Sequence, residues 1–329
     1  MREHAPPDTR LDPRPETASA ATATLERPEL EPRTRRAHIR RAFDRAAPHY
    51  DEAAHVQREI CARLGAFAAA LDLQAALLTG TPVLDAGCGT GFGFAELDRL
   101  CPGAPRIALD LAPAMLAQAR RRHWASGDAG APARTAALDA TPAGGACTDS
   151  ATLHAVCGDL EHLPLAGESL ALIWSSLAIQ WCDPGRALAE CARVLAPGGI
   201  ALIATLGPRT LWELREAFAL IDGARHTIDF HPAARWIEAA RASALVPLAD
   251  EAAEVHACAP DLRHLLQDIK RIGAATVDGG RRRGALGRAA WSRLLADYER
   301  HRRPDGRLPA TYDLILLALR KPHNHGPSR

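Results

Sequence analysis

Residues 83–91 are the segment that most constrains this chain. An apolar stretch ends in Asp85 and opens into a turn with three alternating glycines, Gly87, Gly89 and Gly91. The pattern predicts a buried strand that bends through the turn into a helix. Glycines let the backbone bend sharply and approach a ligand closely, because no Cβ atom stands in the way. The segment therefore predicts a binding site for a nucleotide-like cofactor.

The acid before the glycines decides between two classes of cofactor. A dinucleotide fingerprint runs Gly-x-Gly-x-x-Gly and places the N-terminus of the following helix against a pyrophosphate. Here the order is Asp-x-Gly-x-Gly-x-Gly, and a carboxylate beside the turn suits a cationic amino group better than a phosphate. The turn therefore favours S-adenosylmethionine, and its glycine spacing disfavours an NAD enzyme.

Two further acids follow apolar segments later in the chain. Asp110 comes about 25 residues after Asp85, where a nucleotide-binding βαβ unit places the carboxylate that accepts hydrogen bonds from the ribose hydroxyls. Asp159 follows a third such segment, and we expect it to accept a hydrogen bond from the adenine amino group. The other residues expected to bind the cofactor are Leu111, Met115, Leu160 and Ser176.

Strand-like and helix-like segments alternate along most of the chain, which is typical of a doubly wound, mostly parallel sheet. Two of the expected strands, residues 170–176 and 200–206, are nearly continuous apolar runs, as burial on both faces requires. The other expected strands are residues 82–86, 105–110, 153–157 and 311–319, and helices are expected at 114–124, 184–195 and 210–221. The pattern predicts an α/β fold.

We expect a single domain, residues 33–329, after a disordered tail at residues 1–32 in which acids and prolines are scattered. The domain begins with helical spacing of apolar residues, since Ile39 and Phe43 stand one helical turn apart before Pro48 interrupts.

Two further segments stand out from the alternating pattern. Residues 125–151, rich in Ala, Gly, Thr and Asp, predict a flexible insertion between the second helix and the third strand. Two helices at about 260–303 predict a cap that is inserted before the last strand.

Composition disfavours several classes of protein. With 47% hydrophobic residues among 329, the chain can bury a full core. It has no apolar run of about 20 residues and no secretory signal, so we expect a cytoplasmic protein that does not bind a membrane. The eight cysteines form no Cys-x-x-Cys pair, which argues against disulfides and a zinc site. A net charge of +1 gives no overall field that would attract nucleic acid.

Basic residues are distributed unevenly along the chain, although the net charge is close to zero. Arg281, Arg282 and Arg283 lie in a basic stretch near the C-terminus, and Arg40 and Arg41 belong to a second basic cluster before the predicted sheet. Two interpretations remain open: solvated surfaces in an arginine-rich chain, or a docking surface for an acidic partner.

Several segments resemble a known family. The glycine turn, the acid after the second strand, Gly-Asp-Leu-Glu after the third strand and a Pro-Gly-Gly turn resemble class I S-adenosylmethionine-dependent methyltransferases, which have a Rossmann-like fold. More specific segments are similar to the malonyl-[acyl-carrier protein] O-methyltransferases of biotin synthesis. These segments are residues 42–51, 176–182, 205–214, 269–274 and 308–312.

This resemblance implies a seven-stranded sheet and methyl transfer to the free carboxylate of a malonyl group on acyl-carrier protein or coenzyme A. The carrier is acidic, so the basic clusters become its candidate docking face. A carboxylate is already ionised near neutral pH and is itself the nucleophile, so we expect no general base. The residues expected to bind the substrate are Tyr50, Gln180, Trp181, Lys270, Arg271, Arg307 and Tyr312.

Two other functions remain open at this point. One is a class I methyltransferase that acts on another small acid or on a quinone precursor. The other is a regulator that binds the cofactor without catalysis; the set of acids and glycines described above is complete, which speaks against a decayed site but does not exclude binding without turnover.

Overall fold

A single sheet organises the computed structural model, which describes residues 31–71, 73, 80–125, 153–222, 224, 226–273 and 286–323. Its strand order within these residues is β3-β2-β1-β4-β5-β7-β6. The five strands β1 to β5 run parallel, whereas β7 runs antiparallel to both β5 and β6. The strands are β1 Val83–Ala86, β2 Arg106–Asp110, β3 Leu153–Cys157, β4 Leu170–Ser176, β5 Leu195–Leu206, β6 Val246–Ala259 and β7 Leu308–Arg320.

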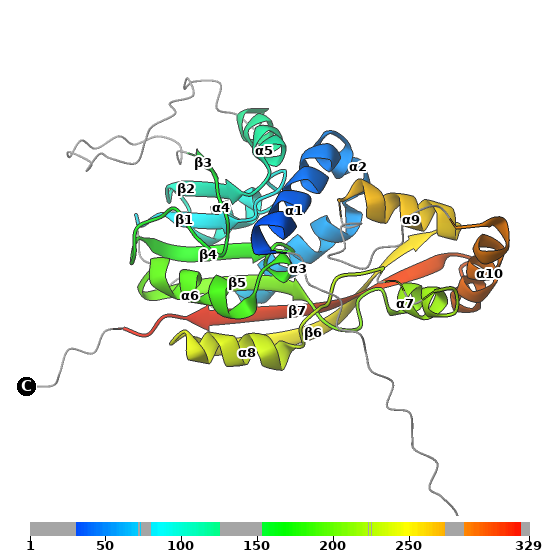
Figure 1. Ribbon diagram of the computed structural model, residues 1–329. Helices are drawn as coiled ribbons and strands as arrows, with labels where there is room; N and C mark the ends of the chain where they lie inside the picture. The colour runs from blue at the N-terminus through cyan, green and yellow to red at the C-terminus, as the bar shows by residue number, and fades with distance from the viewer. Residues whose placement is uncertain are drawn as a thin grey trace, which may run out of the picture.

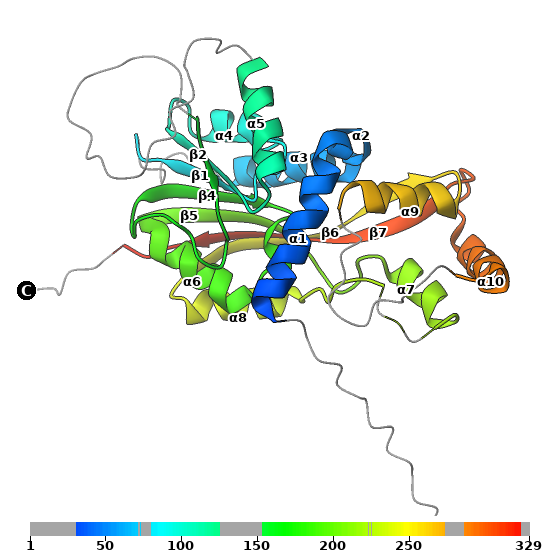
Figure 2. The same cartoon turned by 45° about the horizontal axis from the view of Figure 1, so that its top comes forward.

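Helices cover both faces of this sheet (Figures 1 and 2). Side chains of β4 alternate between two clusters: Leu172 and Trp174 belong to the core that includes α3, and Ile173 belongs to the core that includes α6 and α8. Burial on both sides explains why β4 and β5 are nearly continuous apolar runs. The helices are α1 Pro32–Ala46, α2 Tyr50–Ala53, α3 His55–Ala70, α4 Phe94–Leu100, α5 Pro113–Ala125, α6 Pro184–Val194, α7 Trp212–Ala219, α8 Ala233–Ala242, α9 Leu262–Arg271 and α10 Arg288–Tyr298.

The predicted fold class is confirmed, including the helices inserted before the last strand. The strands β6 and β7 extend beyond the parallel part of the sheet, and α7, α9 and α10 lie around this extended end (Figure 1). In sequence, α9 and α10 connect β6 to β7.

Three elements differ from the sequence-based expectation. The strand β6 and the helix α8 were not predicted. The strand was missed because it lies at the edge of the sheet and its alanines, acids and Pro247 give little β-propensity. The strand β5 begins at Leu195, five residues early, because the Pro-Gly-Gly segment forms an irregularity within the strand in place of a turn before it. Gly198 takes a φ of 84° there.

Other expectations lie partly outside the described residues. These are the tail at residues 1–30, the insertion from residue 126 onward, and Arg281 to Arg283. The helix α1 begins at Pro32, so the last residue assigned to the tail is helical. No helix in the described ranges is long and apolar enough to cross a membrane.

The strand order locates the ligand site. From β1 the chain runs outward to β2 and β3, then returns to β4 on the other side of β1 and continues to β5. In such sheets, ligands bind beyond the carboxyl ends of the strands where the order reverses. Here that place lies beyond the ends of β1 and β4, which are neighbours.

Candidate active site

Three cavities adjoin at this edge of the sheet. The turn cavity, of about 30 Å³, lies against the glycine turn; the strand-end cavity, of about 100 Å³, lies against the ends of β2 and β3. The apolar cavity, of about 250 Å³, lies between α1, α7, α9 and the start of β7. Tyr50 lines all three, so they meet at this side chain.

Asp85 is the acidic side chain of the turn cavity. It is the penultimate residue of β1, is 3% exposed, and its Oδ2 atom has no hydrogen-bond partner in the described structure. Burial, and then the nearby Asp110 carboxylate, raises the pKa of Asp85 to about 8. A buried carboxylate without a partner is costly, so a cationic group in this cavity would be held strongly.

The three glycines all take left-handed backbone conformations, with φ values of 77° at Gly87, 53° at Gly89 and 88° at Gly91. A Cβ atom built on Gly87 would lie 2.1 Å from the Cβ of Ala178. Gly87 and Gly89 line both the turn cavity and the strand-end cavity. The turn therefore needs glycine both for its conformation and for close approach.

Asp110 lines the strand-end cavity at the end of β2. Its two carboxylate oxygens accept hydrogen bonds from the backbone N–H groups of Gly89 at 2.9 Å and Ala112 at 2.8 Å. Burial raises the pKa of Asp110 to about 6, although these hydrogen bonds lower it. Each oxygen of Asp110 retains a second lone pair, so the carboxylate is able to accept hydrogen bonds from two ribose hydroxyls as well. Leu111, Met115, Leu160 and Ser176 line the same cavity.

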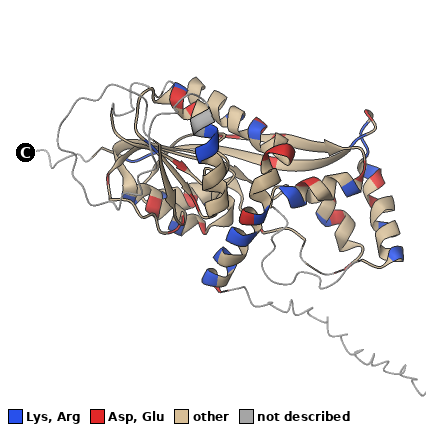
Figure 3. Cartoon of the chain, turned by 90° about the horizontal axis from the view of Figure 1, so that it is seen from above, with Lys and Arg blue, Asp and Glu red and all other residues tan. Residues whose placement is uncertain are grey.

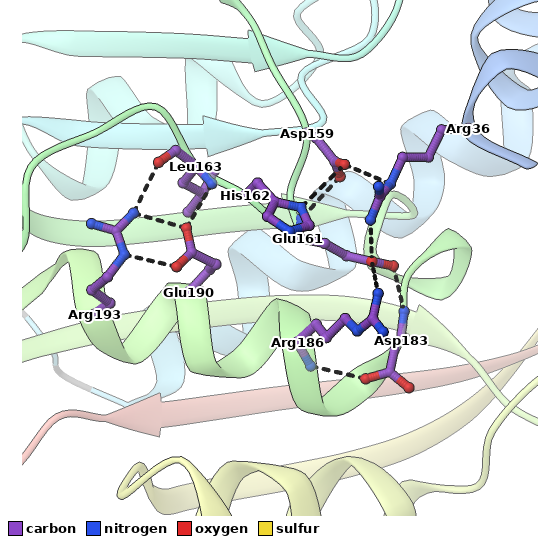
Figure 4. A network of polar contacts seen from close by, with 9 residues as sticks. All are labelled: Arg36, Asp159, Glu161, His162, Leu163, Asp183, Arg186, Glu190 and Arg193. Carbon is purple, nitrogen blue, oxygen red and sulfur yellow. Dashed lines mark hydrogen bonds and ion pairs between the residues drawn. The ribbon is translucent and has the colours of Figure 1, made fainter. Parts of the chain in front are cut away.

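Asp159, the acid expected to bind adenine, is held by an arginine from α1. Arg36 Nε lies 2.6 Å from Asp159 Oδ2, and Arg36 Nη2 lies 2.5 Å from Glu161 Oε2 (Figure 4). The backbone N–H of Glu161 donates to the other oxygen of Asp159 at 2.9 Å. An adenine amino group would therefore share Asp159 with Arg36, and α1 forms one wall of this cavity.

Tyr50 is positioned by its neighbour in sequence. Asp51 accepts a hydrogen bond from Thr90 Oγ1 of the glycine turn at 2.6 Å and also pairs with Arg122 of α5. These contacts fasten α2 to the turn. Burial raises the pKa of Tyr50, and so do the Asp110 and Asp51 carboxylates, so its hydroxyl stays a neutral donor.

The apolar cavity contains Gln180, Trp181 and Tyr312, three of the residues expected to bind the substrate. Gln180 Nε2 donates to the Leu177 carbonyl at 2.7 Å, and Trp181 packs edge-on against Phe43 with ring centres 5.6 Å apart. Among the described lining residues there is no Lys, Arg, Asp or Glu. The lining includes one histidine, His226, whose Nε2 lies 2.9 Å from Asp222 Oδ1, and the cavity otherwise offers hydrogen bonds and apolar surface.

The cationic side chains that were expected to bind the substrate do not line this cavity. Lys270 and Arg271 are exposed on α9, because that helix turns Leu266 and Ile269 toward the cavity. Arg307 is also exposed, and its guanidinium donates to the Cys258 carbonyl. These three residues do not line the apolar cavity: helix rotation and a local hydrogen bond direct their side chains elsewhere.

Sequence reasoning missed two polar residues of the site, the buried Gln57 and the partly buried Arg36. Gln57 lines both the turn cavity and the apolar cavity, and Arg36 lines the strand-end cavity. Gln57 stands next to Val56 and one helical turn before Ile60 and Cys61, so a polar residue on an apolar helix face was a usable signal. No local signal connects Arg36 with Asp159.

The arrangement fits S-adenosylmethionine. The strand-end cavity offers a carboxylate for the ribose and apolar side chains for the adenosine, and the turn cavity offers the unpartnered Asp85 oxygen to the cationic methionine half. The glycines leave room between these two cavities where Cβ atoms would otherwise stand.

Comparison with known proteins agrees with this geometry. A protein family described as a methyltransferase domain matches residues 84–203. The malonyl-[acyl-carrier protein] O-methyltransferase of Dechloromonas aromatica is 41% identical over 90% of this chain and 98% of its own length, and that of Laribacter hongkongensis is 43% identical over 86% and 88%. A crystal structure from Bacillus halodurans superposes with a TM-score of 0.51 at 16% identity, covering 77% of this chain and 98% of that one.

The fold, the glycine turn and the acids at the strand ends together define a class I methyltransferase whose cofactor is S-adenosylmethionine. Within that class, the identity and coverage of the curated relatives are decisive. The chain belongs to the malonyl-[acyl-carrier protein] O-methyltransferase family.

Proposed function

We propose that this protein transfers the methyl group of S-adenosylmethionine to the free carboxylate of a malonyl group on acyl-carrier protein or coenzyme A. The product is the malonyl methyl ester that enters biotin synthesis. The observation that carries the proposal is the largely apolar cavity that meets both cofactor cavities at Tyr50. The names of the relatives supply the substrate.

This reaction depends on positioning the carboxylate against the methyl group more than on acid–base catalysis. S-adenosylmethionine supplies a methyl group bonded to a positively charged sulfur, and the malonyl carboxylate is ionised near neutral pH. The attack cancels both charges, so a cavity with little polar surface favours the transition state over the separated ions. We propose that Trp181, Phe43 and Leu177 exclude water where the apolar and strand-end cavities meet.

We assign the methionine half to Asp85, Gly87 and Gly89, and the adenosine to the residues around Asp110 and Asp159. Tyr50, Gln180, Trp181 and Tyr312 are assigned to the acceptor because they line the apolar cavity.

Mass spectrometry of malonyl-acyl-carrier protein, after incubation with the protein and S-adenosylmethionine, tests this function. We expect a gain of one methyl group that mild ester hydrolysis reverses. Acetyl-acyl-carrier protein and an Asp85→Ala variant serve as controls, and neither should gain the group. Cofactor binding without any methyl gain would contradict the proposal and favour another acceptor or a binding role.

We further propose that the carrier docks on α1. Arg40 and Arg41 are exposed on this helix, and Phe43 of the same helix lines the apolar cavity. Seen from above, basic residues are concentrated along α1 (Figure 3). The alternative docking residues, Arg281 to Arg283, lie outside the described part of the chain.

Reversing both charges, Arg40→Glu with Arg41→Glu, is expected to raise KM for malonyl-acyl-carrier protein about tenfold and leave KM for malonyl-CoA unchanged, because charges at an interface rim mainly steer association. Steady-state kinetics on both substrates checks this. Arg241→Glu, on the exposed side of α8, is the matched control. Equal losses on both substrates would contradict docking at α1.

The expected cytoplasmic location is part of this proposal. Fractionation of cells that express the protein, followed by immunodetection, would test it.

A further inference from the structure

Gln57 is a buried side chain to which the function proposed above gives no role. It lies on α3, is 8% exposed, and lines both the turn cavity and the apolar cavity. Tyr50 is the only other described residue that lines both. An acceptor in the apolar cavity must meet the methyl group where these cavities join, so Gln57 lies at that meeting point.

The hydrogen bonding of Gln57 is incomplete. Its buried Oε1 atom has no hydrogen-bond partner, whereas its amide nitrogen is not among the buried unpartnered atoms and donates no hydrogen bond within the described residues. A buried polar atom without a partner is costly, so the amide of Gln57 points to a ligand that completes its hydrogen bonding. Because nothing holds either end of the amide, Gln57 is free to turn its N–H₂ group toward the cavity.

The other buried amide of the site is not equivalent. One N–H of Gln180 Nε2 donates to the Leu177 carbonyl, which fixes the orientation of the amide and leaves one N–H and the unpartnered Oε1. An amide oxygen repels a carboxylate, since both atoms are hydrogen-bond acceptors. Gln57 is therefore the amide that keeps both N–H donors and a free orientation for an anionic acceptor.

We infer that Gln57 binds the acceptor carboxylate through its amide N–H, holding one oxygen while the other attacks the methyl carbon. In this step a carbon–oxygen bond forms, the carbon–sulfur bond breaks with its electron pair going to sulfur, and no proton moves. A neutral donor suits this step because a fixed cation would stabilise the charged reactants more than the neutral products. The inference rests on the proposed function.

The test compares Gln57→Met and Gln57→Glu with the wild type, because both substitutions keep the length of the side chain. Gln267→Met and Gln267→Glu, on the exposed face of α9, are the matched controls. Three quantities are measured for each full-length protein: Kd for S-adenosylmethionine by calorimetry, kcat/KM for malonyl-CoA at saturating cofactor, and the pH dependence of kcat/KM.

For Gln57→Met we expect kcat/KM for malonyl-CoA to fall on the order of 10- to 100-fold, with Kd for the cofactor within threefold of wild type. For Gln57→Glu we expect a larger loss at high pH that is partly recovered as pH falls, because a protonated carboxyl group donates a hydrogen bond whereas a carboxylate repels the acceptor. The wild type and the Gln267 variants should lack this recovery.

Wild-type kinetics in Gln57→Met would overturn the inference, and so would a loss of cofactor affinity as large as the loss of kcat/KM. A Gln57→Glu profile parallel to that of the wild type would overturn it as well. The same assay separates the two levels of proposal: absence of methyl transfer by the wild type would refute the proposed function, and the role of Gln57 would fall with it.

Discussion

Asp85→Asn is expected to weaken the binding of S-adenosylmethionine about 100-fold, which corresponds to about 2.7 kcal/mol. The carboxylate is buried and its Oδ2 atom is unpartnered, so the cationic methionine half is the group that would compensate its charge. Removing one partner of a buried charge pair typically costs about 2–5 kcal/mol, and the expected loss of binding free energy lies within this range. Isothermal titration calorimetry measures the effect.

Asp250→Asn, an exposed carboxylate on β6, is the matched control and should bind the cofactor as the wild type does. If the two variants bound equally well, Asp85 would not be a cofactor contact.

The same substitution should remove a pH dependence. The pKa of Asp85 is raised to about 8 from its ordinary value of 3.8, so the free protein keeps this group protonated through neutral pH. Binding a cation requires the ionised form, so affinity for the cofactor should rise with pH up to about 8. Conversely, the stability of the free protein due to the protonated group is complete below about pH 4 and is lost as pH rises through 8. Asp85→Asn should flatten both dependences.

Gly87→Ala is expected to destabilise the protein by about 3 kcal/mol and to weaken cofactor binding at least about tenfold. The residue has a φ of 77°, and the added methyl group would lie 2.1 Å from the Cβ of Ala178. Ala178 precedes the short helix Ile179–Trp181, so the displacement would reach the walls of the apolar cavity. Urea unfolding and calorimetry measure the two effects.

Gly103→Ala separates conformational strain from the clash. Its φ of 73° is similar, but an added Cβ atom would meet nothing within 4 Å. We expect about 1 kcal/mol of destabilisation and unchanged cofactor affinity. A Gly87→Ala variant no less stable than Gly103→Ala would show that the close approach at Ala178 is unimportant.

The cofactor half of the site could be predicted because its signals are local. A strand, an acid and glycines that permit positive φ follow one another between Asp85 and Gly91, and the acids at other strand ends repeat the pattern. Parallel strands bring their carboxyl ends to one edge, so these residues meet without further information. The strand β6 lacked such a signal, since an edge strand with exposed side chains needs no apolar run.

The acceptor half could not be predicted equally well, because it depends on which way each helix faces. Lys270 and Arg271 are one and two residues from Ile269, and that difference places them outside the cavity that Ile269 lines. The pair between Arg36 and Asp159 joins residues more than a hundred positions apart. Only the packing of α1 over the strand ends brings them together.

The convergence of three cavities on Tyr50 has a consequence for inhibitor design. A bisubstrate compound, in which a short linker joins adenosine to a carboxylic acid, would occupy the strand-end cavity and the apolar cavity at once. Joining the two fragments makes the second binding event intramolecular, so their affinities reinforce each other without new contacts. Selectivity over other methyltransferases would come from the acid-bearing arm, since the adenosine half uses features common to the whole class.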